Sequence, residues 1–190
     1  MAAKHYITAQ QLLDDSYQLG LAILDSGFKP DLIIGLWRGG APVAIAIHEL
    51  LAYLGCNADH VPLRTSLYRG VQERAADVSI DGLEYFVDNG TPAENILVVD
   101  DVFDTGLTAR AVLAQLKERC AAHADIRMAT LWFKPANNQT DLTPNYFLHQ
   151  TSAWLVFPHE LSGLSSAELA DKPGIDALRT RLTADVTGDR

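Results

Sequence analysis

Acidic and hydroxyl side chains stand close together in the middle of the chain, at positions that could hold a phosphorylated sugar. Asp100 and Asp101 follow an apolar run. Ionised carboxylates accept hydrogen bonds from vicinal hydroxyls or bind a hydrated divalent cation. The hydroxyls and amides of Thr105 and Thr108, at the start of a predicted helix, suit a phosphate. Gly106 between them allows the backbone to approach a ligand closely. These groups together predict a ligand with a phosphate, a diol and a divalent cation.

These side chains are expected between the end of a strand and the start of a helix. Residues 96–99 form a β-branched apolar run, as a strand buried on both faces requires. Residues 109–119 have the composition of a helix. In open α/β sheets, ligands bind at the carboxyl ends of the strands. An acidic strand end before a helix is also a common structural turn, but the paired carboxylates and the preceding apolar run favour a binding site.

A second strand, glycine turn and helix occurs earlier in the chain. Residues 31–36 predict a short strand, and residues 42–54 predict a helix. Between them, Gly39 lies in a turn that presents backbone amides at a helix start. Arg38 adds a planar cation that suits phosphate oxygens. On its own, an Arg-Gly turn after a strand is a weak signal for a binding site.

Residues 97–108 resemble the motif that binds phosphoribosyl diphosphate (PRPP) in the type I phosphoribosyltransferases. The resemblance implies that Asp100 and Asp101 hold the ribose hydroxyls. It also implies a loop that surrounds the 5-phosphate, made of Thr105, Gly106, Leu107 and Thr108. The motif is specific for PRPP and much less specific for the acceptor of the phosphoribosyl group.

The same resemblance indicates which residues act at the reacting bond. Asp104 matches a position near the reacting base nitrogen in purine-using members, where it would stabilise or deprotonate the base. Arg38 and Gly39 match the diphosphate-binding loop, which often carries a strained peptide between these two residues. Asp104 and Arg38 are therefore the predicted catalytic residues. The expected cofactor is Mg²⁺, on Asp100 and Asp101.

Residues in the last third of the chain match the base-binding positions of purine-using members. Lys134, after a predicted strand over residues 126–133, matches a lysine that donates to the exocyclic oxygen of the base. Trp154 could stack on a heterocycle, and the backbone of Leu155 could read its edge. Glu160 matches an acidic position that contacts the metal or the diphosphate. The alternatives are core packing for Trp154 and a purely structural role for Glu160.

The resemblance predicts transfer of the 5-phosphoribosyl group from PRPP to a nucleobase, giving a nucleoside 5′-monophosphate and diphosphate. Lys134 and Trp154 favour a 6-oxopurine acceptor, as in purine salvage. A pyrimidine or another base stays open, as does a regulatory protein that binds PRPP without catalysis. Against the regulator, Asp104, Lys134 and Glu160 supply base-side groups that a sensor would not need.

Composition narrows the class of protein further. The 190 residues carry a formal net charge of −9, which argues against a general nucleic-acid surface. Two cysteines without a spacing pattern argue against a disulfide framework or a zinc site. No run approaches the roughly 18 apolar residues that a membrane span needs. The N-terminus lacks the apolar segment of a signal peptide, so we expect a cytoplasmic protein without a membrane partner.

We predict one α/β phosphoribosyltransferase domain over residues 1–190, with a parallel sheet flanked by helices. Its core would span about residues 30–135. A small hood would be formed by about residues 1–29 and 136–165, followed by a C-terminal tail over residues 166–190. A homodimer or homotetramer is expected because members of the resembled family commonly form them.

Several further elements are predicted around this core. Residues 9–25 have helical spacing after Thr8, a plausible N-cap. Residues 59–63 predict a strand, and a last strand is expected within residues 146–157. Residues 64–81 are polar and lack apolar periodicity, which is typical of a long loop. In the resembled family a hood loop at this place closes over the site, where it would exclude water from the reacting centre.

Overall fold

The computed structural model describes residues 4–68, 77–82, 93–176 and 178. The chain forms two compact units. The smaller unit consists of residues 1–13 together with residues 153–190, and the larger unit is the continuous segment 14–152. A six-stranded sheet lies in the larger unit and a two-stranded sheet in the smaller one.

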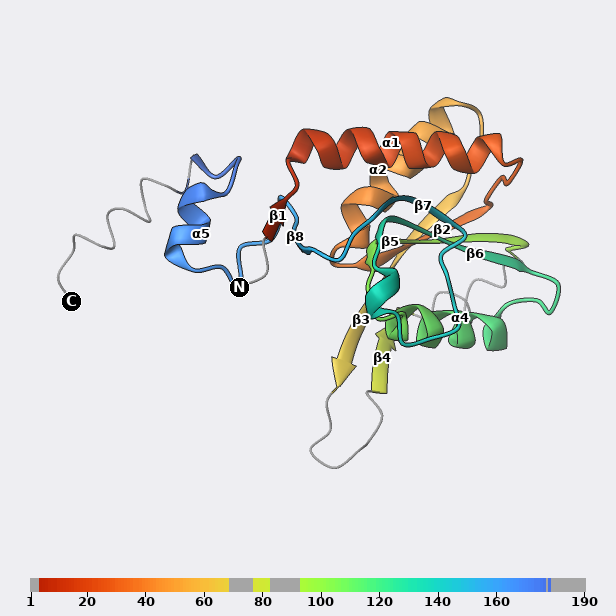
Figure 1. Cartoon of the computed structure of the whole chain (residues 1–190). Helices are drawn as coiled ribbons and strands as arrows, with labels where there is room; N and C mark the ends of the chain where they lie inside the picture. The colour runs from red at the N-terminus through yellow and green to blue at the C-terminus, as the bar shows by residue number, and fades with distance from the viewer. Residues whose placement is uncertain (1–3, 69–76, 83–92, 177, 179–190) are drawn as a thin grey trace. The chain divides into compact units, whose positions relative to one another are not determined.

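The larger unit is built on a mostly parallel sheet with the strand order β4-β3-β2-β5-β6-β7 (Figure 1). Only β4 runs antiparallel to its neighbour, at one edge of this sheet. The strands are β2 (Leu32–Trp37), β3 (Asp59–Tyr68), β4 (Asp77–Asp81), β5 (Asn95–Phe103), β6 (Asp125–Phe133) and β7 (Tyr146–Gln150). The predicted α/β architecture with a parallel sheet is confirmed.

Helices cover both faces of this sheet. From residue 14 onward, α1 (Ala9–Asp25) lies over the same face as α2 (Gly40–Tyr53), and α4 (Leu107–Arg119) lies over the opposite face (Figure 1). Strands covered on both faces need continuous apolar runs. Accordingly, residues 32–36 of β2 and 96–99 of β5 are all buried. Among the described residues, no helix is long and apolar enough to span a membrane.

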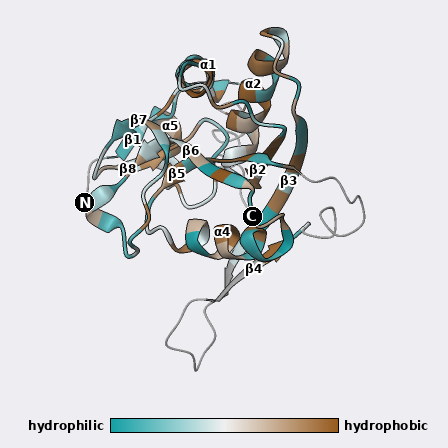
Figure 2. Ribbon diagram, turned by 90° about the vertical axis from the view of Figure 1, so that its right-hand side faces the viewer, coloured by the Kyte–Doolittle hydropathy of each residue, from teal (hydrophilic) through white to brown (hydrophobic). Residues whose placement is uncertain are grey.

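The helix α4 presents one apolar face to the sheet. Its buried residues Ala109, Val112 and Leu116 recur at helical spacing. Figure 2 shows the result as an alternation of hydrophobic and hydrophilic colour along α4. These side chains join Val98 of β5 and Met128 of β6 in one buried apolar cluster. The cluster fixes α4, and therefore the loop before it, against the end of β5.

The connections reverse direction between β2 and β5, which lie side by side in the centre of the sheet. From β2 the chain passes through α2 to β3 on one side, and from β5 it passes through α4 to β6 on the other. Ligands in open α/β sheets bind at such a switch point, outside the carboxyl ends of the strands. Both predicted phosphate-binding turns, after β2 and after β5, lie at this point.

The predicted irregular loop over residues 64–81 is wrong at both of its ends. The strand β3 continues to Tyr68 and pairs antiparallel with β4. A strand pair at a sheet edge that faces water needs no continuous apolar pattern. The polar sequence of β3 and β4 therefore gave no signal for strands. Residues 69–76 lie outside the described part of the chain, as do residues 83–92, and the proposed lid function stays a prediction.

The predicted last strand over residues 146–157 is two strands that belong to different sheets. In the larger unit, β7 pairs with β6, whereas β8 (Trp154–Val156) pairs with β1 (Lys4–Tyr6) in the smaller unit. The backbone N–H of Thr151 donates to the carbonyl of Phe133 just after β7. The polar residues 151–152 therefore end one strand before the next begins.

In the smaller unit, the described part of the predicted C-terminal tail contains a short helix, α5 (Ser166–Asp171). Ser165 and Glu168 form a capping box at its start, which satisfies two backbone donors. After the helix, Lys172 is buried, and its ammonium group donates to the carbonyl oxygen of Phe157 at 2.7 Å. The tail is thereby attached to the turn that follows β8.

Candidate active site

A pair of carboxylates lies near the carboxyl end of β5, at the switch point. Asp101 is buried and Asp100 is half-buried. Asp100 accepts a hydrogen bond of 3.0 Å from the backbone N–H of Asp101. Burial and the adjacent Asp101 carboxylate raise the pKa of Asp100 well above its ordinary value. A divalent cation or hydroxyl donors would favour the ionised form, so the pair fits Mg²⁺ or a ribose diol.

The turn after β2 packs directly against this carboxylate pair. A Cβ atom on Gly39 would collide with the side chain of Asp101, and one on Gly40 would collide with the backbone carbonyl of Val99. Glycine is therefore required for so close an approach of the backbone. Arg38 is exposed on the same turn. The structure thus brings together the two motifs that were predicted separately from the sequence.

The helices α2 and α4 both begin at this point, and their N-cap residues, Gly39 and Gly106, have no side chain with which to cap the first turn. First-turn N–H groups lack intrahelical acceptors, and the positive end of the helix dipole favours an anion. Gly106, which precedes α4, has a φ of +77°, a region that favours glycine. Before α2, a cis peptide joins Trp37 to Arg38, one bond earlier than the strained Arg38–Gly39 peptide that the resemblance indicated.

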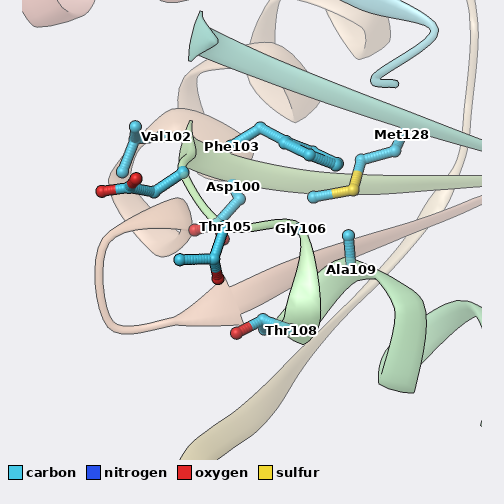
Figure 3. A pocket seen from close by; sticks show the side chains of 9 residues that line it. Asp100, Val102, Phe103, Thr105, Gly106, Thr108, Ala109 and Met128 are labelled. Atoms are coloured by element: carbon cyan, nitrogen blue, oxygen red, sulfur yellow. The ribbon is translucent and has the colours of Figure 1, made fainter. Parts of the chain in front are cut away.

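A cavity of about 230 Å³ opens beside the loop between β5 and α4 (Figure 3). Its polar lining comes from Asp100, Asp104, Thr105 and Thr108, and its apolar lining includes Val102, Phe103, Ala109 and Met128. Figure 3 shows Phe103 and Met128 on one side and the two threonines on the other. The first residue of α4, Leu107, directs its backbone N–H at the hydroxyl of Thr105, at 3.4 Å. The cavity thus combines hydroxyls, a helix start and an apolar wall.

Residues 138–140 pack against the loop before α4 and hydrogen-bond to it. The backbone N–H of Gln139 donates to the carbonyl of Thr105 at 2.9 Å. A Cβ atom on Gly106 would crowd the side chains of Asn138 and Thr140. Asn138 in turn accepts hydrogen bonds from the N–H and the hydroxyl of Thr140. This support of the loop is made of tertiary contacts, so it becomes visible only in the structure.

Asp104 and Lys134 are in direct contact, although 30 residues separate them in the sequence. The ammonium group of Lys134 lies 3.1 Å from Oδ2 of Asp104. Only 9% of the Lys134 side chain is exposed, against 41% for Asp104. The backbone N–H of Lys134 donates to the carbonyl of Phe103 at 2.9 Å, which ties the end of β6 to the end of β5. The predicted base-binding cation and the predicted catalytic carboxylate therefore share one location beside the cavity.

Asn137 belongs to the same cluster, although the sequence did not indicate it. Its side-chain amide donates to Oδ1 of Asp104 at 2.7 Å. The 3₁₀ turn η1 (Pro135–Asn137) directly follows Lys134 and brings Asn137 back toward Asp104. One turn of separation from Lys134 is the only local signal that could have indicated this placement, because the contact with Asp104 is tertiary.

The three other predicted residues lie in the smaller unit. On β8, 62% of Trp154 is exposed, which excludes core packing, whereas Leu155 is buried and lies opposite His5 of β1. Glu160 accepts a hydrogen bond of 3.0 Å from the backbone N–H of Phe157. The proposed roles of Trp154, Leu155 and Glu160 toward a base or a metal stay predictions.

Comparisons with known proteins found similar sequences and similar solved structures. A model of the phosphoribosyl transferase domain family matches residues 7–162. A hypoxanthine-guanine phosphoribosyltransferase of Lactococcus lactis is 27% identical over 145 residues, which are 75% of this chain and 74% of that protein. The crystal structure of a purine phosphoribosyltransferase from Pyrococcus horikoshii matches with 28% identity and a TM-score of 0.67, over 85% of this chain and 97% of that one. A hypothetical protein from Neisseria gonorrhoeae with bound ppGpp shares the fold, with 19% identity and a TM-score of 0.70, over 86% of this chain and 92% of that one.

Proposed function

Because the chain belongs to the phosphoribosyltransferase family, a class of enzymes, we propose that it transfers the 5-phosphoribosyl group of PRPP to a 6-oxopurine. The products are a nucleoside 5′-monophosphate and diphosphate. The proposal of a 6-oxopurine as acceptor rests on the contact between Asp104 and Lys134 beside the cavity. Two of the compared proteins bear names that refer to purine bases, which supports the same choice.

PRPP would bind across the switch point between β2 and β5. Its 5-phosphate would occupy the polar side of the cavity, where Thr105, Thr108 and the uncapped start of α4 supply donors. The ribose hydroxyls would lie on Asp100 and Asp101. The diphosphate would lie at the turn after β2, where Arg38, Gly39 and the uncapped start of α2 supply a cation and backbone amides.

We infer that Mg²⁺ would be held by Asp100 and Asp101. Among the described residues, no group of three or more His, Cys, Asp or Glu side chains could hold a metal ion. Mg²⁺ needs no such group, because it commonly binds one or two carboxylates together with substrate phosphates and water. When bound, it would neutralise negative charge on the leaving diphosphate.

The reaction breaks the bond between ribose C1 and diphosphate and forms a bond between C1 and a base nitrogen. Its expected transition state is oxocarbenium-like, as at other anomeric carbons. Asp104 would accept the proton that the base nitrogen loses. Arg38 would hold the leaving diphosphate, so that positioning and electrostatic stabilisation supply most of the rate.

Lys134 would distinguish a 6-oxopurine from a 6-aminopurine. An ammonium group carries three donors and no acceptor, so it matches an exocyclic oxygen and opposes an exocyclic amino group. Because Lys134 already lies 3.1 Å from Asp104, one bound base could contact both side chains.

The test is nucleotide formation from hypoxanthine and PRPP with Mg²⁺, in the wild type and three variants. Asp104→Asn should lower kcat about 10²- to 10⁴-fold, the usual contribution of a general base. Lys134→Met should raise the KM for hypoxanthine about tenfold or more and leave the KM for PRPP nearly unchanged. Lys117→Met, an exposed lysine in the last turn of α4, is the matched control and should behave as the wild type. Equal activity of all four proteins would contradict the assignment.

A further inference from the structure

The carboxylate of Asp104 is held by two donors that differ in chemistry. The ammonium group of Lys134 contacts Oδ2 at 3.1 Å, and the side-chain amide of Asn137 contacts Oδ1 at 2.7 Å. With one donor on each oxygen, rotation of the carboxylate about its Cβ–Cγ bond is restrained. Because an ionised carboxylate offers about four lone-pair sites, Asp104 can still accept a further hydrogen bond.

The two donors are not equally available when a base is bound. In the proposed reaction Lys134 donates to the exocyclic oxygen of the base, so its contact with Asp104 weakens at that moment. Asn137 has no such second task. We propose that Asn137 is a positioning residue that keeps the Asp104 carboxylate oriented while Lys134 turns to the base. This inference rests on the proposed function.

The backbone around Asn137 is suited to this role. Its N–H donates to the carbonyl of Lys134 at 3.1 Å, which closes the 3₁₀ turn. The backbone N–H of Lys134 donates in turn to the carbonyl of Phe103, the residue that precedes Asp104. Pro135 restricts the first step of the turn. Two successive backbone hydrogen bonds therefore connect residue 137 to the residue before Asp104, which limits how far the two side chains can move apart.

The charge of the side chain at position 137 is the property to test. Aspartate has nearly the shape of asparagine but offers no donor when ionised, so Asn137→Asp would replace an attraction for Asp104 by a repulsion. Asn137 is exposed, so the substitution should change the stability of the fold very little. A residue with only a structural role in the turn would tolerate this change.

The experiment compares Asn137→Asp, Asn137→Ala and Asn137→Ser with Ala136→Asp as the control. Ala136 is exposed on the same turn, so Ala136→Asp adds the same charge one residue away. Steady-state kinetics with hypoxanthine and PRPP give kcat and both KM values, and thermal unfolding gives Tm. Loss of a hydrogen bond to a charged group should lower kcat about tenfold in Asn137→Ala.

Asn137→Asp should lower kcat more, on the order of a hundredfold, because it adds repulsion to the loss of the donor. Asn137→Ser, which keeps a donor, should lie between the wild type and Asn137→Ala. In all of these proteins, including the control, the Tm and the KM for PRPP should stay close to the wild-type values. This separation of kcat from Tm is the result that a structural role would not produce.

Two results would overturn the inference while the proposed function stands. One is an active wild type with equal kcat for Asn137→Asp and Ala136→Asp. The other is a loss of activity in the Asn137 variants that parallels a loss of Tm. A wild-type protein that converts no base would instead reject the proposed function, and the inference with it, before any variant is made.

Discussion

At the scale of single residues, the ionised Asp100 side chain should lower the stability of the folded protein, and a bound ligand would relieve this effect. Its pKa is raised by burial and by the neighbouring Asp101. At a pH below the ordinary carboxyl pKa, the side chain is neutral in both the folded and the unfolded chain. As the pH rises, the unfolded chain ionises first, so the free energy of unfolding falls until the raised pKa of the folded state is passed. Above this raised pKa the folded protein bears the full cost of the carboxylate.

Replacement of Asp100 should accordingly stabilise the protein while it abolishes PRPP binding. We expect Asp100→Asn to raise the Tm by a few degrees at pH 7 to 8, because it removes a half-buried charge beside Asp101. The gain should shrink as the pH is lowered toward 4. Thermal unfolding across this pH range and PRPP calorimetry measure the two effects. The exposed Asp141→Asn is the control, and a Tm gain that is equal at all pH values would contradict the burial of a charge as its cause.

At the scale of elements, the site depends on how closely the turn after β2 approaches β5. Gly39 has a φ of −66°, which any residue can adopt, so an alanine there would fail only because its Cβ meets Asp101. Displacement of the turn by even 1 Å can cost about a hundredfold in rate. The position of this turn therefore depends on how it packs against β5, and not on the conformation of Gly39 alone.

We predict that Gly39→Ala lowers kcat/KM for PRPP about a hundredfold. Gly55→Ala is the matched control, because Gly55 has a φ of +84° and an added Cβ atom would meet no other atom within 4 Å. That control should lose about 1 kcal/mol of stability and keep its activity. Steady-state kinetics and chemical unfolding of both variants separate collision from backbone strain. Normal activity in Gly39→Ala would contradict the packing described for this turn.

Lys172 permits a test in the smaller unit. Burial lowers the pKa of Lys172, although the nearby Glu160 opposes this effect. Between the lowered pKa and the ordinary lysine pKa the unfolded chain binds more protons, so stability should rise with pH in that window. Lys172→Met should lose this alkaline rise in Tm, and Lys4→Met, a partly exposed lysine in the same unit, should keep it. Parallel pH profiles for the wild type and Lys172→Met would count against burial as the cause.

The elements that could be predicted from sequence are those with a strong local pattern. The helix over residues 9–25 and the buried run of β5 have continuous periodic or apolar signals, and both are found in the structure. The pairing of β3 with β4 and the separation of β7 from β8 depend on which strands lie next to each other, which no local pattern encodes. Asp104 and Lys134 could be predicted because each matches a position of a known family. Asn137 matches no motif, and its place in the site depends on a tertiary contact with Asp104.

At the scale of the whole molecule, a chain with a net charge of −9 is proposed to bind a highly charged anion. The local field of two helix N-termini, Arg38 and a divalent cation would have to exceed this overall repulsion. The larger unit contains the residues proposed to bind PRPP in the turns after β2 and β5. It also contains Asp104, Lys134 and Asn137. Assembly into a homodimer or homotetramer stays a prediction, as does a cytoplasmic location.

The central claim is that this chain joins PRPP to a 6-oxopurine, and diphosphate release tests it most directly. The purified full chain is supplied with PRPP, Mg²⁺ and, in separate reactions, hypoxanthine, guanine, xanthine, adenine, uracil or orotate. We predict release with at least one 6-oxopurine and little with adenine, because Lys134 offers only donors. Release with uracil or orotate alone would contradict the base-side assignment. Tight PRPP binding without release on any base would contradict the proposed catalysis and indicate a regulatory protein.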